Sequence, residues 1–272
     1  MIALWMFLAC AGSDGEGSTG SELPPVGEPV TRLVLHEVFS GSNCGPCAPA
    51  AENIAAALDD QKGAYTLLKY QIGSDPYITP EAVSRRMLYL PGERTYGIPW
   101  LVADGLHSVH PNEMEDGGVY GPDDFLSMAD EPAFLFIDVE STVTNQTVSV
   151  DIQLWPTQDI EGEDLRLFVA IKENNTENNI GSNGQSDFKA VLKKFVPDEK
   201  GTPLDTLTAG VLTGHSFSYT FEGEYDAETT GANPVDHSSA HTVEEFEDLD
   251  VVVWVQDMVT WEVFNSGTSG TE

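Results

Sequence analysis

The sequence predicts two structural classes in one chain: an α/β segment with a mixed sheet and flanking helices over residues 31–131, and an all-β sandwich over residues 132–272. Strand and helix patterns alternate in the first segment, as they do where helices pack on a mixed sheet. In the second segment, apolar and polar residues alternate strictly, and Gly-, Asn- and Asp-rich loops separate the strands. Asp130-Glu131-Pro132 interrupts both patterns and marks the boundary.

The first segment has the predicted order β, α, β, α, β, β, α. Thr79 is suited to cap the second helix and Pro80 to occupy its first position. Asp104-Gly105 is a favoured turn pair and joins the last two strands as a hairpin. The predicted elements are a strand over 31–39, an Ala-rich helix over 46–63, a strand over 64–72, a helix over 79–90, two strands within 97–109 and a short helix over 121–130.

The second segment shows the period of two that is typical of half-buried strands. Two sets of residues each share one strand face, namely Val148, Val150, Ile152 and Leu154, and then Leu165, Leu167, Val169 and Ile171. The stretches over 215–225 and 249–264 continue the pattern. The second of these is predicted to be a hairpin that turns near Asp257 to Thr260.

Forty-five acidic residues against twelve basic ones give a formal net charge of −33, and hydrophobic residues make up 40% of the chain. That hydrophobic content is enough to build cores, so a disordered chain is not expected. The negative charge repels nucleic acid phosphates and anionic membrane surfaces, so no nucleic acid partner is expected. A solvated acidic surface is the favoured interpretation, with calcium capture as the minority alternative.

Residues 1–30 combine a short apolar run with a Gly/Ser/Glu/Pro tract, a combination that indicates an export signal followed by a flexible tether. Phe7-Leu8-Ala9-Cys10 resembles the lipobox of bacterial lipoproteins, which implies lipidation of Cys10 and attachment to a membrane through the lipid alone. Simple secretion, with cleavage at Ala9-Cys10-Ala11, is the alternative. In both cases the two remaining cysteines are expected in a compartment where disulfides persist.

Those two cysteines form the motif Cys44-Gly45-Pro46-Cys47 at the start of the first predicted helix. The spacing brings both sulfurs to one side of the first turn, close enough to form a disulfide. A helix N-terminus favours the thiolate, which is the species that attacks a disulfide. Cys44 is therefore the expected nucleophile, and Cys47, one turn further on, the expected resolving thiol.

Three other interpretations of the pair remain. A zinc site normally needs four ligands, and the chain has no second cysteine pair; His107 and His110 are the nearest candidates, so no metal is expected. A purely structural disulfide would close too small a loop to stabilise the fold much. The third interpretation is a remnant that no longer takes part in redox chemistry.

The opening strand, the Cys-Gly-Pro-Cys pair at a helix start and the later stretch "YGIPWLVADG" resemble the thioredoxin family, in the same order. In that fold an Ile-Pro pair with a cis peptide bond opens a strand that faces the active cysteines, and Ile98-Pro99 matches it. The resemblance implies a thioredoxin-like domain over 31–131, with Ile98 and Pro99 as substrate-docking residues. Trp100 is a further docking candidate, with a core aromatic as the favoured alternative.

The sequence departs from thioredoxins at two supporting positions. Asn43 stands where an aromatic residue usually precedes the first cysteine. Val38 stands where thioredoxins carry a buried aspartate that assists proton transfer to the resolving thiol. Glu37 is adjacent, but strand alternation points it to the opposite face, so it is only a minor candidate for a substitute base.

The mature chain as a whole resembles the outer membrane protein 28-related family of bacterial envelope lipoproteins, in which a thioredoxin-like domain precedes a β-rich one. The stretches that carry this resemblance are "RLVLHEVFSGSNCGPCAPA", "VLKKFVPDEKGTPL" and "DLDVVVWVQDMVTWEVFNS". It implies export, a lipid anchor at the outer membrane or the periplasmic face, and a thioredoxin fold.

The leading hypothesis is an envelope thiol-disulfide oxidoreductase that acts on protein disulfides through Cys44 and Cys47, with Pro99 shaping access. No flavin or nicotinamide fingerprint is present, so no cofactor is expected and an external redox partner is needed. The alternative is a redox-inactive envelope binding or adhesion lipoprotein, in which the thioredoxin-like fold is a scaffold and the β-sandwich contacts the ligand. Its loops over 174–187 and 226–239 would then contact a ligand or calcium, although ordinary solvated loops are the favoured interpretation.

Overall fold

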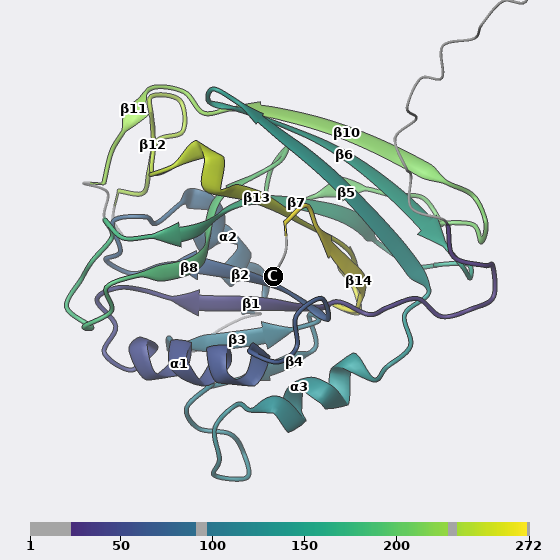
Figure 1. Cartoon of the computed structure of the whole chain (residues 1–272), viewed down its shortest axis with the longest axis horizontal. Helices are drawn as coiled ribbons and strands as arrows, with labels where there is room; N and C mark the ends of the chain where they lie inside the picture. The colour runs from purple at the N-terminus through teal and green to yellow at the C-terminus, as the bar shows by residue number, and fades with distance from the viewer. Residues whose placement is uncertain (1–22, 91–96, 228–232, 271–272) are drawn as a thin grey trace, which may run out of the picture.

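The computed structural model describes residues 23–90, 97–227 and 233–270 (Figure 1). The predicted lipidation site at Cys10 and part of the acidic loop over 226–239 lie outside the described residues. The elements, in chain order, are β1 Val34–Ser40, α1 Cys47–Leu58, β2 Tyr65–Gln71, α2 Pro80–Leu88, β3 Trp100–Ala103, β4 His107–Val109, α3 Pro122–Ala129, β5 Leu135–Thr144, β6 Thr147–Pro156, β7 Leu165–Thr176, β8 Phe188–Phe195, β9 Thr202–Pro203, β10 Thr213–Thr220, β11 Glu224–Tyr225, β12 Ala240–His241, a short 3-10 helix Phe246–Asp248, β13 Leu249–Asp257 and β14 Val263–Thr268.

The predicted order of elements in the first segment is confirmed. The Thr79 side chain caps α2 by accepting a hydrogen bond from Ala82 N at 3.1 Å. The β3–β4 turn has positive φ at Asp104 (44°) and Gly105 (73°), as a tight hairpin requires. The helix α1 ends at Leu58 rather than near residue 63. Two aspartates follow Leu58 directly, and negative charge is unfavourable at a helix C-terminus.

One nine-stranded sheet runs through both sequence segments, with the order β14-β13-β7-β8-β2-β1-β3-β4 and β9 beside β7. Its strands β1 and β2 are parallel, and β8 from the second segment joins β2, also in parallel. The predicted division into two domains is therefore not confirmed, because backbone pairing continues across residue 131. Strand β8 covers an edge of β2 that would otherwise be open.

A second sheet, in the order β10-β6-β5, packs on the part of the large sheet that β7 and β13 form (Figure 1). The alternating residues predicted to share a face do so, and they are buried between the two sheets. The two packed layers correspond to the predicted sandwich, but one of them is part of the sheet that also carries β1 to β4. The opposite face of β7 and β13 is buried as well, through Phe168 and Trp254, because these strands are central in that sheet.

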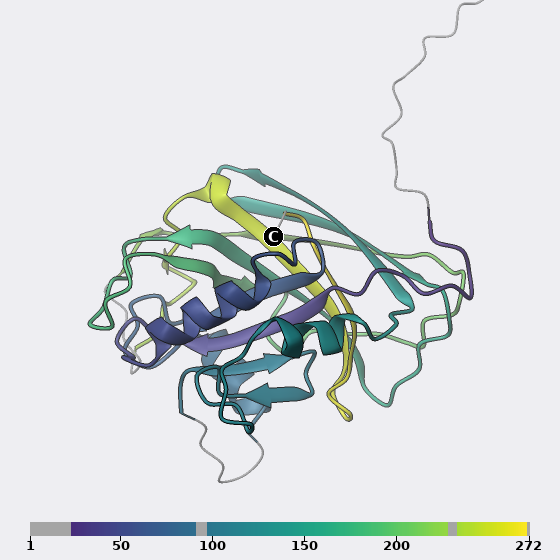
Figure 2. The ribbon, with the colours of Figure 1, turned by 60° about the horizontal axis from the view of Figure 1, so that its bottom comes forward.

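The two faces of β1 support different layers. Val34 and Val38 pack against α1 and α3, which lie over β1 in Figure 2. Leu35 and Phe39 point to the other face, where α2 packs. The cysteine pair at the start of α1 therefore lies on the Val38 side of the strand.

Glu37 points to the α2 face, as strand alternation predicts. Its carboxylate accepts hydrogen bonds from Arg85 Nε at 2.8 Å and from the Tyr70 hydroxyl at 2.6 Å, and both members of the Glu37–Arg85 ion pair are fully buried. Arg85 also donates to Gln256 Oε1 at 2.7 Å, which links this cluster to β13. Burial disfavours the charged guanidinium, but the adjacent Glu37 carboxylate raises the pKa of Arg85. Glu37 therefore serves a structural ion pair and is not placed to act as a base for the cysteines.

The last part of the predicted flexible tether is ordered against the second sheet. Trp155 Nε1 donates to the carbonyl oxygen of Pro24 at 2.8 Å, and Gly27 N donates to that of Thr157 at 2.7 Å. A backbone bridge pairs Val30 with Ala133. The end of the 1–30 segment is thus fixed in place, because β6 offers it hydrogen-bonding groups. No helix in the described part of the chain is long and apolar enough to cross a membrane.

Candidate thiol-disulfide site

Cys44 and Cys47 form a disulfide, and their Cα atoms lie 5.3 Å apart. Two turn hydrogen bonds shape the motif: Cys44 N donates to the carbonyl oxygen of Gly41, and Cys47 N to that of Cys44, each at 3.1 Å. Cys44 is half-buried and lies just outside α1, whereas Cys47 is the first residue of the helix and is 1% exposed. A partner can therefore reach Cys44 and cannot reach Cys47.

The N-terminus of α1 is well suited to stabilise negative charge at this pair. Pro46 occupies the N-cap position, no side chain caps the helix, and its first turn holds no acidic residue. The unpaired N–H groups at such a terminus carry a partial positive charge. In the reduced protein, that charge favours a thiolate at the adjacent cysteine.

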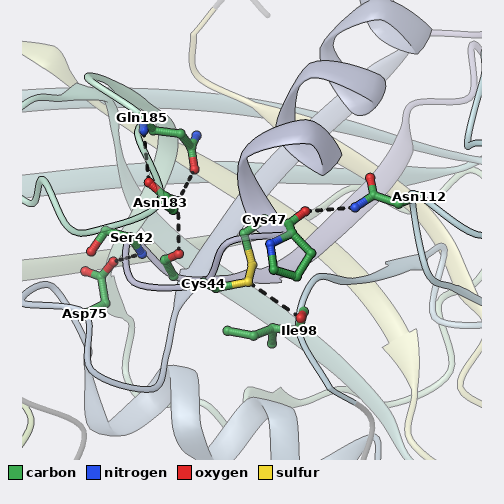
Figure 3. Close-up of a disulfide and its surroundings, with 10 residues drawn as sticks. Ser42, Cys44, Cys47, Asp75, Ile98, Asn112, Asn183 and Gln185 are labelled. Carbon is green, nitrogen blue, oxygen red and sulfur yellow. Dashed lines mark hydrogen bonds between the residues drawn. A yellow bond between two sulfur atoms is a disulfide. The ribbon is translucent and has the colours of Figure 1, made fainter.

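The loop before β3 faces the cysteine pair, as the resemblance implied (Figure 3). The Ile98–Pro99 peptide bond is cis, which confirms the prediction. Cys44 Sγ lies 3.6 Å from the Ile98 carbonyl oxygen. Ile98 is half-buried and Pro99 is buried, so Ile98 presents the more accessible side chain of the two.

Trp100 lies in the core and not on the docking surface. It is 3% exposed, stacks on Phe39 at 5.0 Å between ring centroids, and donates from Nε1 to Ser108 Oγ at 2.7 Å. Trp100 is therefore a core aromatic residue, because β3 points this side chain to the α2 face of the sheet. Ile98 and Pro99 remain as the docking candidates.

A loop from the second segment lies directly against the cysteine motif. It connects β7 and β8, and its Asn183 N donates to the Ser42 carbonyl oxygen at 2.9 Å (Figure 3). Ser182 N donates to Asn43 Oδ1 at 3.0 Å. Asn43, which replaces the usual aromatic residue, thus anchors this loop. No sequence pattern predicts this contact, because loop composition does not encode which surface a loop meets.

Asp75 fixes the motif from its other side. Its buried carboxylate accepts a hydrogen bond from Ser42 N at 2.7 Å and another from Tyr77 N at 2.8 Å. Burial raises the pKa of Asp75, although both of these hydrogen bonds act in the opposite direction. The carboxylate therefore holds the backbone just before Cys44 in place.

Behind Cys47 lies a cavity of about 10 Å³. Val38 lines it at the position where thioredoxins carry an aspartate, and two polar side chains from β2, Lys69 and Gln71, line it as well. Lys69 is 8% exposed and Gln71 1% exposed. The remaining residues that line the cavity are Ser40, Ala50, Ala51, Pro99, Gln185 and Phe188.

Neither Lys69 nor Gln71 was predicted as a site residue, although the pattern of β2 contains a signal for them. Alternation along β2 puts both on the face that carries Leu67, and Leu67 packs toward α1. Lys69 is also the register partner of Val38 across the parallel β1–β2 pair. The sequence thus already shows a lysine on the buried face of this strand. Only the register, however, places it behind Cys47.

Within the described residues, no cluster of three or more histidine, cysteine, aspartate or glutamate side chains is arranged to hold a metal. His107 and His110, the nearest candidates by sequence, lie at β4 and directly after it. The site therefore consists of the cysteine pair, the start of α1, the Ile98–Pro99 loop and the cavity behind Cys47.

No family model matches the chain, and no curated protein matches it. Two solved structures share its fold over most of its length. HBP35 of Porphyromonas gingivalis superposes with a TM-score of 0.65 at 16% identity, covering 88% of this chain and 74% of its own. Protein AGR_C_4864 from Agrobacterium tumefaciens superposes with a TM-score of 0.53 at 13% identity, covering 89% of this chain and 94% of its own. At such identities the likeness establishes a shared fold and no shared activity.

Proposed function

We propose that this protein is a thiol-disulfide oxidoreductase of the cell envelope that acts on protein disulfides through Cys44 and Cys47. One observation carries the proposal: a half-buried cysteine and a buried cysteine are paired at an uncapped helix N-terminus, opposite a loop with a cis proline. These are the parts that a thioredoxin-like redox site needs, and they are supplied by the order of elements that the resemblance implies for residues 31–131.

The arrangement supports reduction of a partner in two steps. The Cys44 thiolate attacks a substrate disulfide, so that a mixed disulfide forms and one substrate sulfur leaves as a thiolate. The Cys47 thiol then loses its proton and attacks Cys44 Sγ, which releases the second substrate thiolate. Two electrons have passed to the substrate, and the Cys44–Cys47 disulfide remains. An external protein dithiol must reduce this disulfide before the next cycle.

The setting of this activity is part of the same proposal. The apolar start of the chain and the lipobox-like residues before Cys10 support export and a lipid anchor in the bacterial envelope, with secretion as the alternative. The quoted sequence stretches support membership of the outer membrane protein 28-related lipoproteins. The redox partner and the substrates would then be envelope proteins that carry thiols or disulfides.

Insulin reduction with dithiothreitol as the electron source tests the activity. The experiment uses the Cys10→Ser chain, in which Cys44 and Cys47 are the only thiols, and compares it with the same chain carrying Cys44→Ser. We expect insulin to precipitate faster with the first protein, and no faster than the dithiothreitol background with the second. If the two proteins give equal rates, the oxidoreductase proposal is wrong.

A further inference from the structure

Lys69 connects the resolving cysteine to solvent. In the described structure it is the one residue that lines both the 10 Å³ cavity behind Cys47 and an open groove of about 430 Å³ beside α1. Its side chain forms no hydrogen bond or ion pair with any residue that the structure describes. Burial of a charged lysine without a partner costs free energy, so this setting favours the neutral amine.

The proposed chemistry needs a proton acceptor at this place. Cys47 must lose its thiol proton before it can attack the mixed disulfide, and at 1% exposure it cannot give that proton directly to solvent. Of the residues that line the small cavity, only Cys47 and Lys69 can gain or lose a proton near neutral pH. Val38 supplies no carboxylate, and Glu37 is held by Arg85 on the other face of the sheet.

We propose that Lys69 is the proton acceptor for Cys47 in the resolving step and passes the proton to the groove beside α1. This inference rests on the proposed function. In the step, the neutral Lys69 amine takes the Cys47 thiol proton and becomes an ammonium. The Cys47 sulfur forms a bond to Cys44 Sγ, the mixed disulfide breaks, and the substrate leaves as a thiolate. The Lys69 ammonium then loses its proton to solvent in the groove.

Gln71 supports the transfer. Its amide nitrogen and oxygen are buried, and neither has a hydrogen-bond partner among the described residues. A cavity of about 10 Å³ takes a single water molecule, which needs polar partners of this kind. An amide can donate to such a water and also accept from it. A water held by Gln71 would bridge the Cys47 sulfur and the Lys69 amine.

Burial favours the neutral amine that this role requires. It lowers the pKa of Lys69 to about 8, with Asp187 acting to raise it and Lys189 acting to lower it further. A proton acceptor works best when its pKa lies close to the working pH. The titratable groups that line the groove around Lys69 are Asp59, Lys62, Tyr65, Lys172 and Lys189.

A lysine and an aspartate behind the resolving cysteine have opposite electrostatic effects. A buried carboxylate disfavours a neighbouring thiolate, whereas an ammonium favours it. Removal of Lys69 should therefore move the titration midpoint of the Cys47 thiol upward. Removal of a carboxylate in that position would move it downward, so the sign of the change identifies the group.

The resolving step can be followed directly with Ellman's reagent, in the Cys10→Ser chain. The reduced protein releases one thionitrobenzoate when Cys44 reacts and a second when Cys47 attacks the mixed disulfide. We expect Lys69→Met to slow the second release about 10- to 100-fold at pH 7 and to abolish its rise near pH 8. Lys69→Arg keeps the charge but cannot accept a proton, so it should also lose that rise. Lys62→Met, in the groove but outside the cavity, should behave like the parent.

A titration separates this inference from the proposed function. The ultraviolet absorbance of the thiolate is measured against pH in the Cys10→Ser, Cys44→Ser chain, with and without Lys69→Met, after circular dichroism has shown that both are folded. An upward shift of the Cys47 midpoint supports Lys69 even if insulin reduction fails. An unchanged midpoint together with an unchanged second release overturns the inference. A parent protein that never releases the second thionitrobenzoate overturns it too.

Discussion

At the scale of single residues, β1 holds a buried histidine in an uncharged environment. His36 is fully buried on the α1 face. Its Nδ1 donates to the Val34 carbonyl oxygen at 3.1 Å, and its Nε2 accepts from the Tyr120 hydroxyl at 2.8 Å, an arrangement that fits a neutral ring. Burial lowers the pKa of His36 to about 4, although the hydrogen bond to Val34 acts against this.

This histidine should make the protein sensitive to acid. Its folded pKa of about 4 lies below the ordinary histidine value of 6.5, so between these values the unfolded chain binds a proton that the folded protein does not. The stability is complete above pH 6.5 and falls as the pH is lowered toward 4, by up to about 3 kcal/mol for this one group. Urea unfolding at pH 7 and pH 4.5 measures the loss, and His36→Gln should lose less than the parent. Parallel losses in the two proteins would refute this assignment, and the exposed His107→Gln is the control.

At the scale of elements, two hairpin turns hold the outer strands of the sheet together. The β3–β4 turn lies against the β13–β14 turn, and a Cβ added to Gly105 would lie 1.9 Å from the Trp261 carbonyl oxygen. The Asp104 side chain ties the same turn to β1 and to the residues before it. Its Oδ1 accepts a hydrogen bond from Leu35 N at 2.8 Å, and its Oδ2 forms an ion pair with Arg32 at 2.7 Å. The Asp104-Gly105 pair therefore closes the β3–β4 hairpin and also connects it to β1 and to the β13–β14 turn.

Gly105→Ala should destabilise the protein by about 3 kcal/mol or more, because the new methyl group meets backbone that has no room to move. Gly63→Ala is the matched control: Gly63 has a similar positive φ of 78°, but nothing lies within 4 Å of an added Cβ. That substitution should lower the free energy of unfolding only by the strain of an alanine at positive φ, about 1–2 kcal/mol. Chemical denaturation of both variants gives the comparison. Equal losses would mean that the contact with Trp261 contributes nothing.

At the scale of the whole molecule, the nine-stranded sheet makes the two sequence segments depend on each other. Strand β8 pairs with β2, and Phe168 and Trp254 share one core with the α2 face of β1 and β2. Charge is also divided unevenly between surface and interior. Within the described residues, four basic and six acidic side chains are buried, so the outer surface remains strongly acidic; the basic ones are Lys69, Arg85, Lys172 and Lys193, and the acidic ones are Glu37, Asp75, Glu81, Asp104, Glu173 and Asp257.

A chain that ends at residue 131 should therefore fail to fold by itself. It would expose the β2 edge and the apolar residues that now contact β7 and β13. The full chain is expected to unfold in a single cooperative transition, and the fragment to show none, as followed by circular dichroism during heating. A cooperative transition of the fragment would instead support an independent domain over 31–131.

The sequence alone predicted the parts that depend on neighbouring residues. The order of elements over residues 31–130, the cap at Thr79, the turn at Asp104-Gly105 and the buried faces of β6 and β7 all follow from local periodicity and turn chemistry. The placement of Cys44 and Cys47 at a helix start, and the cis bond at Pro99, came from motifs of a few residues. Local interactions were sufficient to specify each of these features.

Only the tertiary structure decided how distant segments meet. It joined β8 to β2, brought the β7–β8 loop onto Asn43, and placed Lys69 and Gln71 behind Cys47. A period of two tells which face of a strand is buried, but it does not tell which strand will lie beside it. Pairing between residues far apart in the chain depends on the packing of the complete core. For that reason the sequence located the cysteine pair, and the fold supplied the group that we propose receives the Cys47 proton.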